Sequence, residues 1–273
     1  MSGQIIDLQD WFDTPPGRYL LDWEQAQFDH AVADVFGYHA LQLGLGKVHG
    51  LRANRIPNRW LAADPGAEFD PDTVTRTYGN AALLTAFDAL PFAANSLDLV
   101  LLPHTLELGA DPHATLREVE RVLVPEGRVV ICCLNPASLW GIRQWRARMF
   151  RRWGVGDLFL PESGDFIGYR RMRDWLRLLG FEVESSRFGA YRPAVSTDAW
   201  LERYRWFDKA GARWWPIFGA VYFIVAIKRV RGMRLLQADW RRSPARAATA
   251  PMPIAGRVRR ETSAPCANHT KTE

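Results

Sequence analysis

The chain has 273 residues, of which 48% are apolar, and a formal net charge of +5. This length and apolar content suffice for one α/β domain with insertions and do not require a second domain. The positive charge gathers at the C-terminus: from Lys228 onward eleven Lys and Arg stand against three Asp and Glu (+8), which leaves 24 against 27 (−3) in the preceding part. An acidic body argues against a protein that binds nucleic acid over its whole surface.

Cysteine usage and the N-terminal composition indicate the cytoplasm. Cys132 and Cys133 are neighbours in an expected buried strand, so their side chains point to opposite faces, which suits neither a disulfide nor a metal site. The first sixteen residues carry aspartates and lack the basic and long apolar segments of a secretory signal. We therefore expect a cytoplasmic protein, without an apolar run long enough for a transmembrane segment.

The first part of the chain predicts one helix and three short strands. An approximate apolar stripe over residues 18–36 indicates the helix. Residues 38–43 read as the first strand, which runs into a glycine turn. Residues 59–63 and 82–86 are expected as the second and third strands.

Two further strands and a helix between them form a βαβ unit. Residues 97–102 and 128–134 are continuous apolar runs, typical of strands buried on both faces of a parallel sheet. Between them, Asp111 can cap the free amides of a helix, and Pro112 fits the first turn, where no N–H is missed. A crossover of about this length is what two parallel strands need.

The motifs around this unit resemble the core signature of the class I, seven-stranded S-adenosylmethionine-dependent methyltransferases, in particular the type 11 group. The matching residues are Asp88, Leu90-Pro91-Phe92, Ser96-Leu97-Asp98, Asp111-Pro112, Glu118, Arg121-Val122-Leu123 and Pro125-Glu126-Gly127. A small bacterial branch of undefined substrate is similar, with Leu-Pro-His-Thr-Leu after one strand and Asn-Pro after the next. The resemblance implies a Rossmann-like α/β fold, whose seven-stranded sheet is mostly parallel with an antiparallel last strand, in three α/β/α layers.

The same resemblance divides the chain into three parts. Residues 1–37 are an N-terminal helical lead, and residues 38–230 are the methyltransferase domain. Residues 139–168 and 189–216 are expected to be insertions that cover the substrate. Residues 231–273 form a basic tail whose composition predicts disorder.

The resemblance also implies S-adenosyl-L-methionine as the cofactor, with contacts from Gln42, Gly44, Gly46, Asp64, Asp88 and Leu90. Two positions depart from the family's glycine loop, because Gln42 replaces an acid and Val48 replaces the third glycine. Gln42 can still accept a hydrogen bond from the cofactor's ammonium group, without a full charge. Asp64 is placed to bind ribose hydroxyls, although the same residues also make a good turn. Asp88 is expected near the adenine amino group and stands two positions closer to Leu-Pro-Phe than in the family.

His104 is the candidate catalytic residue, because it directly follows the fourth strand. In this fold, the carboxyl end of that strand faces the methyl acceptor. Imidazole titrates near neutrality, so His104 could accept a proton from a hydroxyl or amine acceptor. The alternative is a histidine hydrogen-bonded within the loop that shapes the pocket, since methyl transfer itself requires no base.

Residues 139–153 combine tryptophans with arginines on an expected helix. Ile142, Trp145 and Met149 share one face, which predicts either packing on the body or docking on an anionic membrane or an acidic partner. The basic tail could likewise associate with membrane or nucleic acid.

Three functions remain open from the sequence. The resemblance implies an S-adenosylmethionine-dependent methyltransferase, and the aromatic residues in the expected cover favour a planar or lipophilic small molecule as its acceptor. The departures at Gln42 and Val48 favour a non-catalytic scaffold with the methyltransferase fold. The basic tail favours an RNA-associated methyltransferase.

Overall fold

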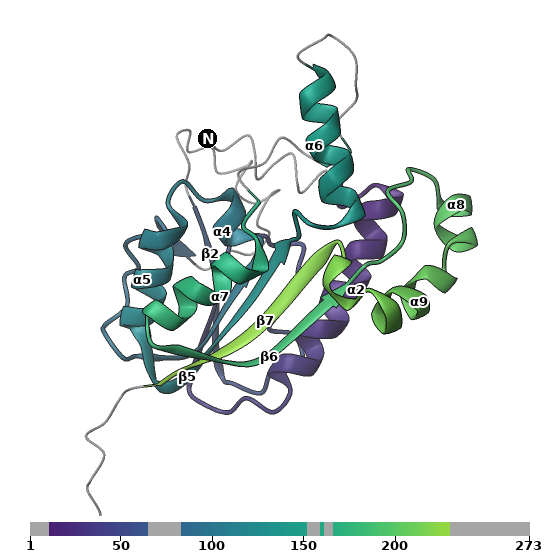
Figure 1. The fold of residues 1–273 in the computed structure, drawn as a ribbon. Coiled ribbons are helices and arrows are strands. Elements are labelled where there is room, and N and C mark those ends of the chain that lie inside the picture. Colours follow the sequence, from purple (N-terminus) through teal and green to yellow (C-terminus); the bar gives the residue numbers. More distant parts are fainter. Residues whose placement is uncertain (1–10, 65–82, 152–158, 161–165, 230–273) are drawn as a thin grey trace, which may run out of the picture. The chain divides into compact units, whose positions relative to one another are not determined.

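The computed structural model describes residues 11–64, 83–151, 159–160 and 166–229. These residues form a seven-stranded sheet in the order β3-β2-β1-β4-β5-β7-β6, flanked by helices (Figure 1). The strands are β1 (His39–Leu43), β2 (Asn58–Ala63), β3 (Leu83–Leu84), β4 (Leu97–Pro103), β5 (Leu123–Leu134), β6 (Phe181–Gly189) and β7 (Val221–Lys228). The helices are α2 (Pro15–Val32), α4 (Thr105–Leu108), α5 (Pro112–Val122), α6 (Leu139–Arg151), α7 (Tyr169–Leu178), α8 (Asp198–Arg203), α9 (Trp206–Trp214) and the 3₁₀ turn η1 (Pro216–Phe218).

Strand directions confirm the predicted sheet. Strands β3, β2, β1, β4 and β5 pair in parallel, whereas β7 runs antiparallel to both β5 and β6. The carboxyl ends of β1, β2, β4, β5 and β6 therefore lie at one edge of the sheet, together with the start of β7. Segments that follow the parallel strands begin at this edge, which is where open α/β sheets bind ligands.

Helices cover the sheet on both faces, as the three-layer prediction requires. Helix α2 packs Leu20, Phe28 and Val32 against one face, in a core that also contains Cys132. Helices α5 and α7 pack against the other face, in a core that contains Cys133. Alternate residues of the central strands thus supply two separate cores, which explains why these strands are apolar throughout.

Local signals set the boundaries of two helices. Asp111 caps α5 by accepting hydrogen bonds from the backbone N–H groups of His113 and Ala114, both at 2.9 Å, and Pro112 opens the helix as predicted. Helix α2 begins earlier than predicted, at Pro15, because Thr14 caps it and prolines fit the first turn. It also ends earlier, so that Phe36, expected in the buried stripe, is 72% exposed.

Several predictions fall outside the described residues. These are the start of the N-terminal lead at 1–37, part of the insertion at 139–168 and the basic tail at 231–273. In the part of the chain that the structure describes, no helix has both the length and the apolar character needed to cross a membrane.

Candidate functional site

The turn after β1 carries the expected glycine loop. Gly44 adopts φ +76°, a conformation that favours glycine, and its N–H donates to the Ala62 carbonyl at 2.8 Å. Residues 44–57 are all described and form turns and irregular backbone rather than a helix. The turn therefore has the left-handed glycine expected of such a loop, with Gly44 buried and Gly46 partly exposed, but lacks the helix N-terminus that usually follows it.

The Gln42 side chain is hydrogen-bonded to the backbone of this loop. Its side chain is buried, and its amide nitrogen donates to the carbonyls of Leu45 at 2.9 Å and Val48 at 2.6 Å. Its amide oxygen accepts from the Gly50 N–H at 3.1 Å. Both protons of the Gln42 side-chain amide are thus donated within the loop. These hydrogen bonds hold the irregular backbone of residues 45–50, where the family has a helix. The predicted hydrogen bond to a cofactor ammonium would have to share the amide oxygen with Gly50.

The other predicted cofactor residues follow adjacent strands. Asp64 comes directly after β2, and Asp88 lies four residues after β3 with an exposed side chain. Leu90 is buried, and its N–H donates to Glu118 Oε1 at 2.8 Å. Since β1, β2 and β3 are parallel neighbours, Gly44, Asp64 and Asp88 are brought to the same edge of the sheet. Their predicted roles toward the cofactor remain predictions.

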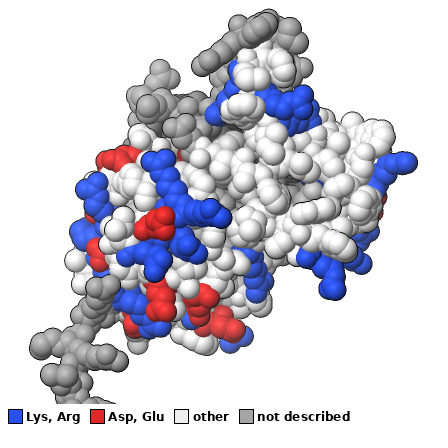
Figure 2. All heavy atoms as spheres, in the orientation of Figure 1, with Lys and Arg blue, Asp and Glu red and all other residues white. Residues whose placement is uncertain are grey.

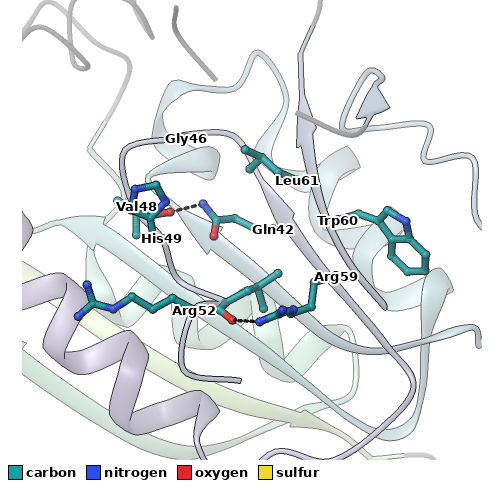
Figure 3. Close-up of a pocket in the computed structure, with 9 residues that line it drawn as sticks. Gln42, Gly46, Val48, His49, Arg52, Arg59, Trp60 and Leu61 are labelled. Atoms are coloured by element: carbon teal, nitrogen blue, oxygen red, sulfur yellow. Dashed lines mark hydrogen bonds between the residues drawn. The ribbon is translucent and has the colours of Figure 1, made fainter. Parts of the chain in front are cut away.

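A cavity of about 420 Å³ opens beside the loop (Figure 3). It is lined by Gln42, Gly46, Val48, His49, Leu51, Arg52, Arg59, Trp60 and Leu61. Gln42 and Gly46 are the predicted site residues that reach it. The cavity adjoins the irregular segment that takes the place of a helix between β1 and β2, so it exposes the side of the loop and part of β2.

His104 is enclosed by two carboxylates at the end of β4. It is fully buried, with φ 54°. One ring nitrogen, Nε2, lies 2.7 Å from Glu24 Oε1, and the other, Nδ1, is hydrogen-bonded to Glu107 Oε1. Glu107 Oε2 in turn accepts from the Leu134 N–H at 2.8 Å. The cluster thus joins α2, the turn after β4 and the end of β5.

The charge on His104 opposes its predicted role as a general base. Burial disfavours the imidazolium, but the adjacent Glu24 and Glu107 carboxylates outweigh this effect and raise the pKa of His104 to about 10. The ring is therefore protonated at neutral pH, and both of its N–H groups donate to carboxylates. The alternative, a histidine that holds its loop in place, matches this geometry.

The same cluster includes atoms that could in principle bind a metal. Ligand atoms of Glu24, His104 and Cys132 lie within 4.8 Å of one another. However, burial and the nearby Glu24 carboxylate raise the pKa of the Cys132 thiol well above its usual value, so the sulfur stays protonated. The imidazolium already supplies the positive charge between the carboxylates, which makes this a buried ionic cluster.

Sequence reasoning missed Glu24 and Glu107. A signal for Glu24 exists, because Leu20, Glu24 and Phe28 follow i, i+4 spacing and all three are buried. An acid within an apolar helical stripe predicts a buried partner of opposite charge. Glu107 lies one helical turn after His104, a spacing at which side chains meet.

The segment predicted to cover the substrate, residues 189–216, forms α8, α9 and the start of η1 and is anchored to α2. Tyr19 donates its hydroxyl to Asp208 Oδ1 at 2.5 Å, and the Arg192 Nε donates to Asp208 Oδ2 at 2.9 Å. Burial and the Asp208 carboxylate raise the pKa of Tyr19, so the phenol remains a donor. These contacts fix the insertion at the carboxyl edge of the sheet.

Helix α6 presents its predicted apolar face to solvent. Its inner face consists of Trp140, Gln144 and Ala147, all buried, and Gln144 bonds to the backbone of residues 159–160. Ile142, Trp145 and Met149 are exposed. Of the two alternatives for this stripe, burial against the body is therefore not what the structure shows, and docking stays a prediction.

Comparison with known proteins identifies the family. A methyltransferase-domain model of the type 11 group matches residues 41–131. An uncharacterized Escherichia coli protein, YafS, is 42% identical over 182 residues, which cover 65% of this chain and 67% of YafS. An uncharacterized Mycobacterium tuberculosis protein, Rv2003c, is 31% identical over 130 residues, covering 48% of this chain and 44% of its own.

Solved structures agree with the fold. A chain of the complex that contains the Haloferax volcanii Trm112 methyltransferase activator superposes with a TM-score of 0.53 at 21% identity, covering 82% of this chain and 98% of that one. An S-adenosylmethionine-dependent methyltransferase from Archaeoglobus fulgidus gives a TM-score of 0.50 at 16% identity, covering 76% and 94%. With its strand order, its βαβ motifs and these matches, the chain belongs to the class I, seven-stranded methyltransferases of the type 11 group.

Proposed function

We propose that the protein transfers a methyl group from S-adenosylmethionine to a small lipophilic or planar acceptor. The observation that carries this proposal is the left-handed glycine turn at the carboxyl end of β1, within a chain of the methyltransferase family. The glycine backbone of Gly44 and Gly46 would approach the cofactor, Asp64 would hold its ribose, and Asp88 would lie near its adenine.

The bound cofactor supplies an already activated methyl group on a sulfonium. The chain then needs to align the acceptor and exclude water, and no base is required for an acceptor with a free lone pair. A protonated, enclosed His104 is consistent with such a reaction. Its part is to hold the turn after β4 at the edge where the acceptor would enter.

An apolar cavity supports the choice of acceptor. It measures about 400 Å³ and is lined by Ala137, Leu139, Ile142, Tyr191, Phe207, Gly211, Trp215 and Phe218. These residues belong to segments that follow β5 and β6, so the cavity opens at the carboxyl edge of the sheet. Among the residues that the structure describes, its lining includes no acidic or basic side chain, which favours a lipophilic ligand over a charged one.

The test is transfer of a labelled methyl group from S-adenosylmethionine to cell extract separated into organic-soluble, aqueous and RNA fractions. Label in an organic-soluble small molecule, lost in Gly44→Leu, is the expected result. Label in RNA would favour the RNA-associated methyltransferase. Cofactor binding without transfer to any fraction would argue against the enzyme.

The second candidate is a non-catalytic scaffold, which the use of the Gln42 amide inside the loop favours. In that case S-adenosylmethionine and its demethylated product would leave the melting temperature unchanged. For the enzyme, either ligand raises it, because a ligand of the native state stabilises by mass action.

A further inference from the structure

A row of large apolar side chains is exposed at the end of the insertion that carries α9 and η1. Residues 212–218 are consecutively exposed, and the last five of them are Trp214, Trp215, Pro216, Ile217 and Phe218. Trp214 is 72% exposed. Runs of exposed apolar residues are rare on soluble proteins and mark sites of interaction.

This row is held in place by buried and partly buried polar contacts. The Tyr191 hydroxyl donates to the Pro216 carbonyl at 2.8 Å. The Asn135 amide donates to the carbonyls of Ile217 at 2.7 Å and Gly219 at 2.9 Å. The backbone is thus fixed to the body while the side chains remain exposed. Their exposure therefore belongs to the ordered fold and does not come from a loosely attached segment.

Helix α6 adds a second apolar element to the same surface. Ile142 and Leu139 line the apolar cavity together with Trp215 and Phe218, so the start of α6 lies beside η1. Further along α6, Trp145 is 63% exposed, and Met149 and Phe150 are exposed as well. We call Trp145, Met149, Phe150, Trp214, Trp215, Ile217 and Phe218 the aromatic surface.

The charges around the aromatic surface are mainly positive. Arg146 lies on α6, and Lys209 and Arg213 lie on α9, all exposed. The acids of this insertion are already paired: Asp198 with Arg18, Glu202 with Arg205, and Asp208 with Arg192. Figure 2 shows this end of the molecule mostly white with blue patches, whereas red atoms gather chiefly at the other end of the same face.

We propose that the aromatic surface docks the protein on an anionic phospholipid membrane. Tryptophan side chains favour the membrane–water interface, and neighbouring Arg and Lys are attracted to anionic headgroups. Two separate elements would each insert apolar side chains, and the cavity between them would open toward the lipid. A second copy of the chain is disfavoured as the occupant, because the described residues of this basic surface include no unpaired acid for a symmetric contact.

The experiment is co-sedimentation of the full chain with vesicles of phosphatidylcholine, with and without phosphatidylglycerol. The apolar variant is Trp145→Ser with Trp214→Ser, matched to Phe36→Ser with Tyr38→Ser, which are 72% and 74% exposed at the opposite edge of the sheet. The charge variant is Arg146→Glu with Arg213→Glu, matched to Arg170→Glu with Arg173→Glu on α7. All eight positions are exposed, so each variant should keep the wild-type melting temperature.

The wild type should sediment with vesicles that contain phosphatidylglycerol and less with phosphatidylcholine alone. Each aromatic-surface variant should bind about tenfold more weakly, equivalent to about 1.4 kcal/mol, whereas its matched control should bind like the wild type. Binding that is equal in variants and controls would overturn the proposal, because the basic tail is intact in all of them. A wild-type dimer that the Trp145→Ser, Trp214→Ser variant dissociates in ultracentrifugation would also overturn it.

Discussion

The turns after β1 and β4 have similar backbones and contrasting side chains. Each strand leaves the sheet through a residue with positive φ, +76° at Gly44 and 54° at His104. The two turns are in contact, because Thr105 Oγ1 donates to the Leu43 carbonyl at 2.7 Å. After β1 the residue has no side chain, whereas after β4 the side chain is buried between two carboxylates.

At the same end of the sheet, the turn after β4 therefore stabilises the fold, whereas the turn after β1 is the one that we expect to bind the cofactor. A left-handed conformation costs a histidine energy that glycine does not lose, so the contacts of the His104 ring have to offset it. The charged cluster beneath β4 thereby fixes the edge, whereas in the turn after β1 Gly44 is buried and Gly46, which is partly exposed, lines the cavity. Gln42 also has a structural role, because its side-chain amide is hydrogen-bonded within the loop, although it lies beside the turn that is predicted to bind the cofactor.

Removing the buried cation should have the largest effect. His104→Gln leaves Glu24 and Glu107 buried without their positive partner, so the free energy of unfolding should fall by about 3–5 kcal/mol. Urea denaturation measures this loss, with His30→Gln on the exposed surface of α2 as the control. A loss no larger than that of the control would contradict the ionic cluster.

The same cluster predicts a pH dependence. The folded-state pKa of His104 is raised from 6.5 to about 10, so its contribution is fully present below pH 6.5 and is lost as pH rises through about 10. Within this window the folded state holds one proton more than the unfolded state, and stability should fall by about 1.4 kcal/mol per pH unit. Denaturation between about pH 7 and 8, above the titration of unfolded histidine and below that of unfolded cysteine at about 8.5, should show this slope in the wild type and lose it in His104→Gln. Parallel slopes for both proteins would exclude a protonated His104.

Changes at Gln42 should have intermediate effects. Gln42→Ala removes hydrogen bonds to Leu45, Val48 and Gly50, which should cost about 1–3 kcal/mol of stability. Gln42→Glu restores the acid of the family but turns a carboxylate toward two carbonyl oxygens, so it should destabilise the loop and weaken cofactor binding. Thermal melts with and without S-adenosylhomocysteine measure both quantities. Tighter binding by Gln42→Glu would show that the side chain reaches the cofactor.

The smallest effect is expected at the glycine turn itself. Gly44→Ala should cost about 1 kcal/mol because φ is positive, and Gly180→Ala, at φ +83°, should cost about the same. Gly180 precedes β6 at the opposite edge of the sheet, so only the Gly44 change should also weaken the binding of S-adenosylhomocysteine. Equal ligand affinity in the two variants would separate the turn from the binding site.

Local signals in the sequence predicted much of the fold. Two continuous apolar runs and the Asp111-Pro112 helix start define the βαβ unit without knowledge of distant contacts. The position of the glycine turn follows from its place after the first strand. Such features depend on a few neighbouring residues, so a single sequence can reveal them.

Long-range partners could not be read in the same way. His104 and Glu24 are 80 residues apart, and the proton-accepting role predicted for His104 ignored that partner. On α6, the stripe of Ile142, Trp145 and Met149 indicated an amphipathic helix but not which face would be buried. The burial of Gln144 instead depends on hydrogen bonds to the backbone of residues 159–160, which no helical periodicity predicts.

The central claim is that the edge near Gly44 binds the methyl-transfer cofactor, and calorimetric titration with S-adenosylhomocysteine tests it most directly. The wild type and Gly180→Leu should each bind one molecule per chain, and Gly44→Leu should bind none while remaining folded. Absence of binding heat in the wild type up to millimolar ligand would contradict the claim.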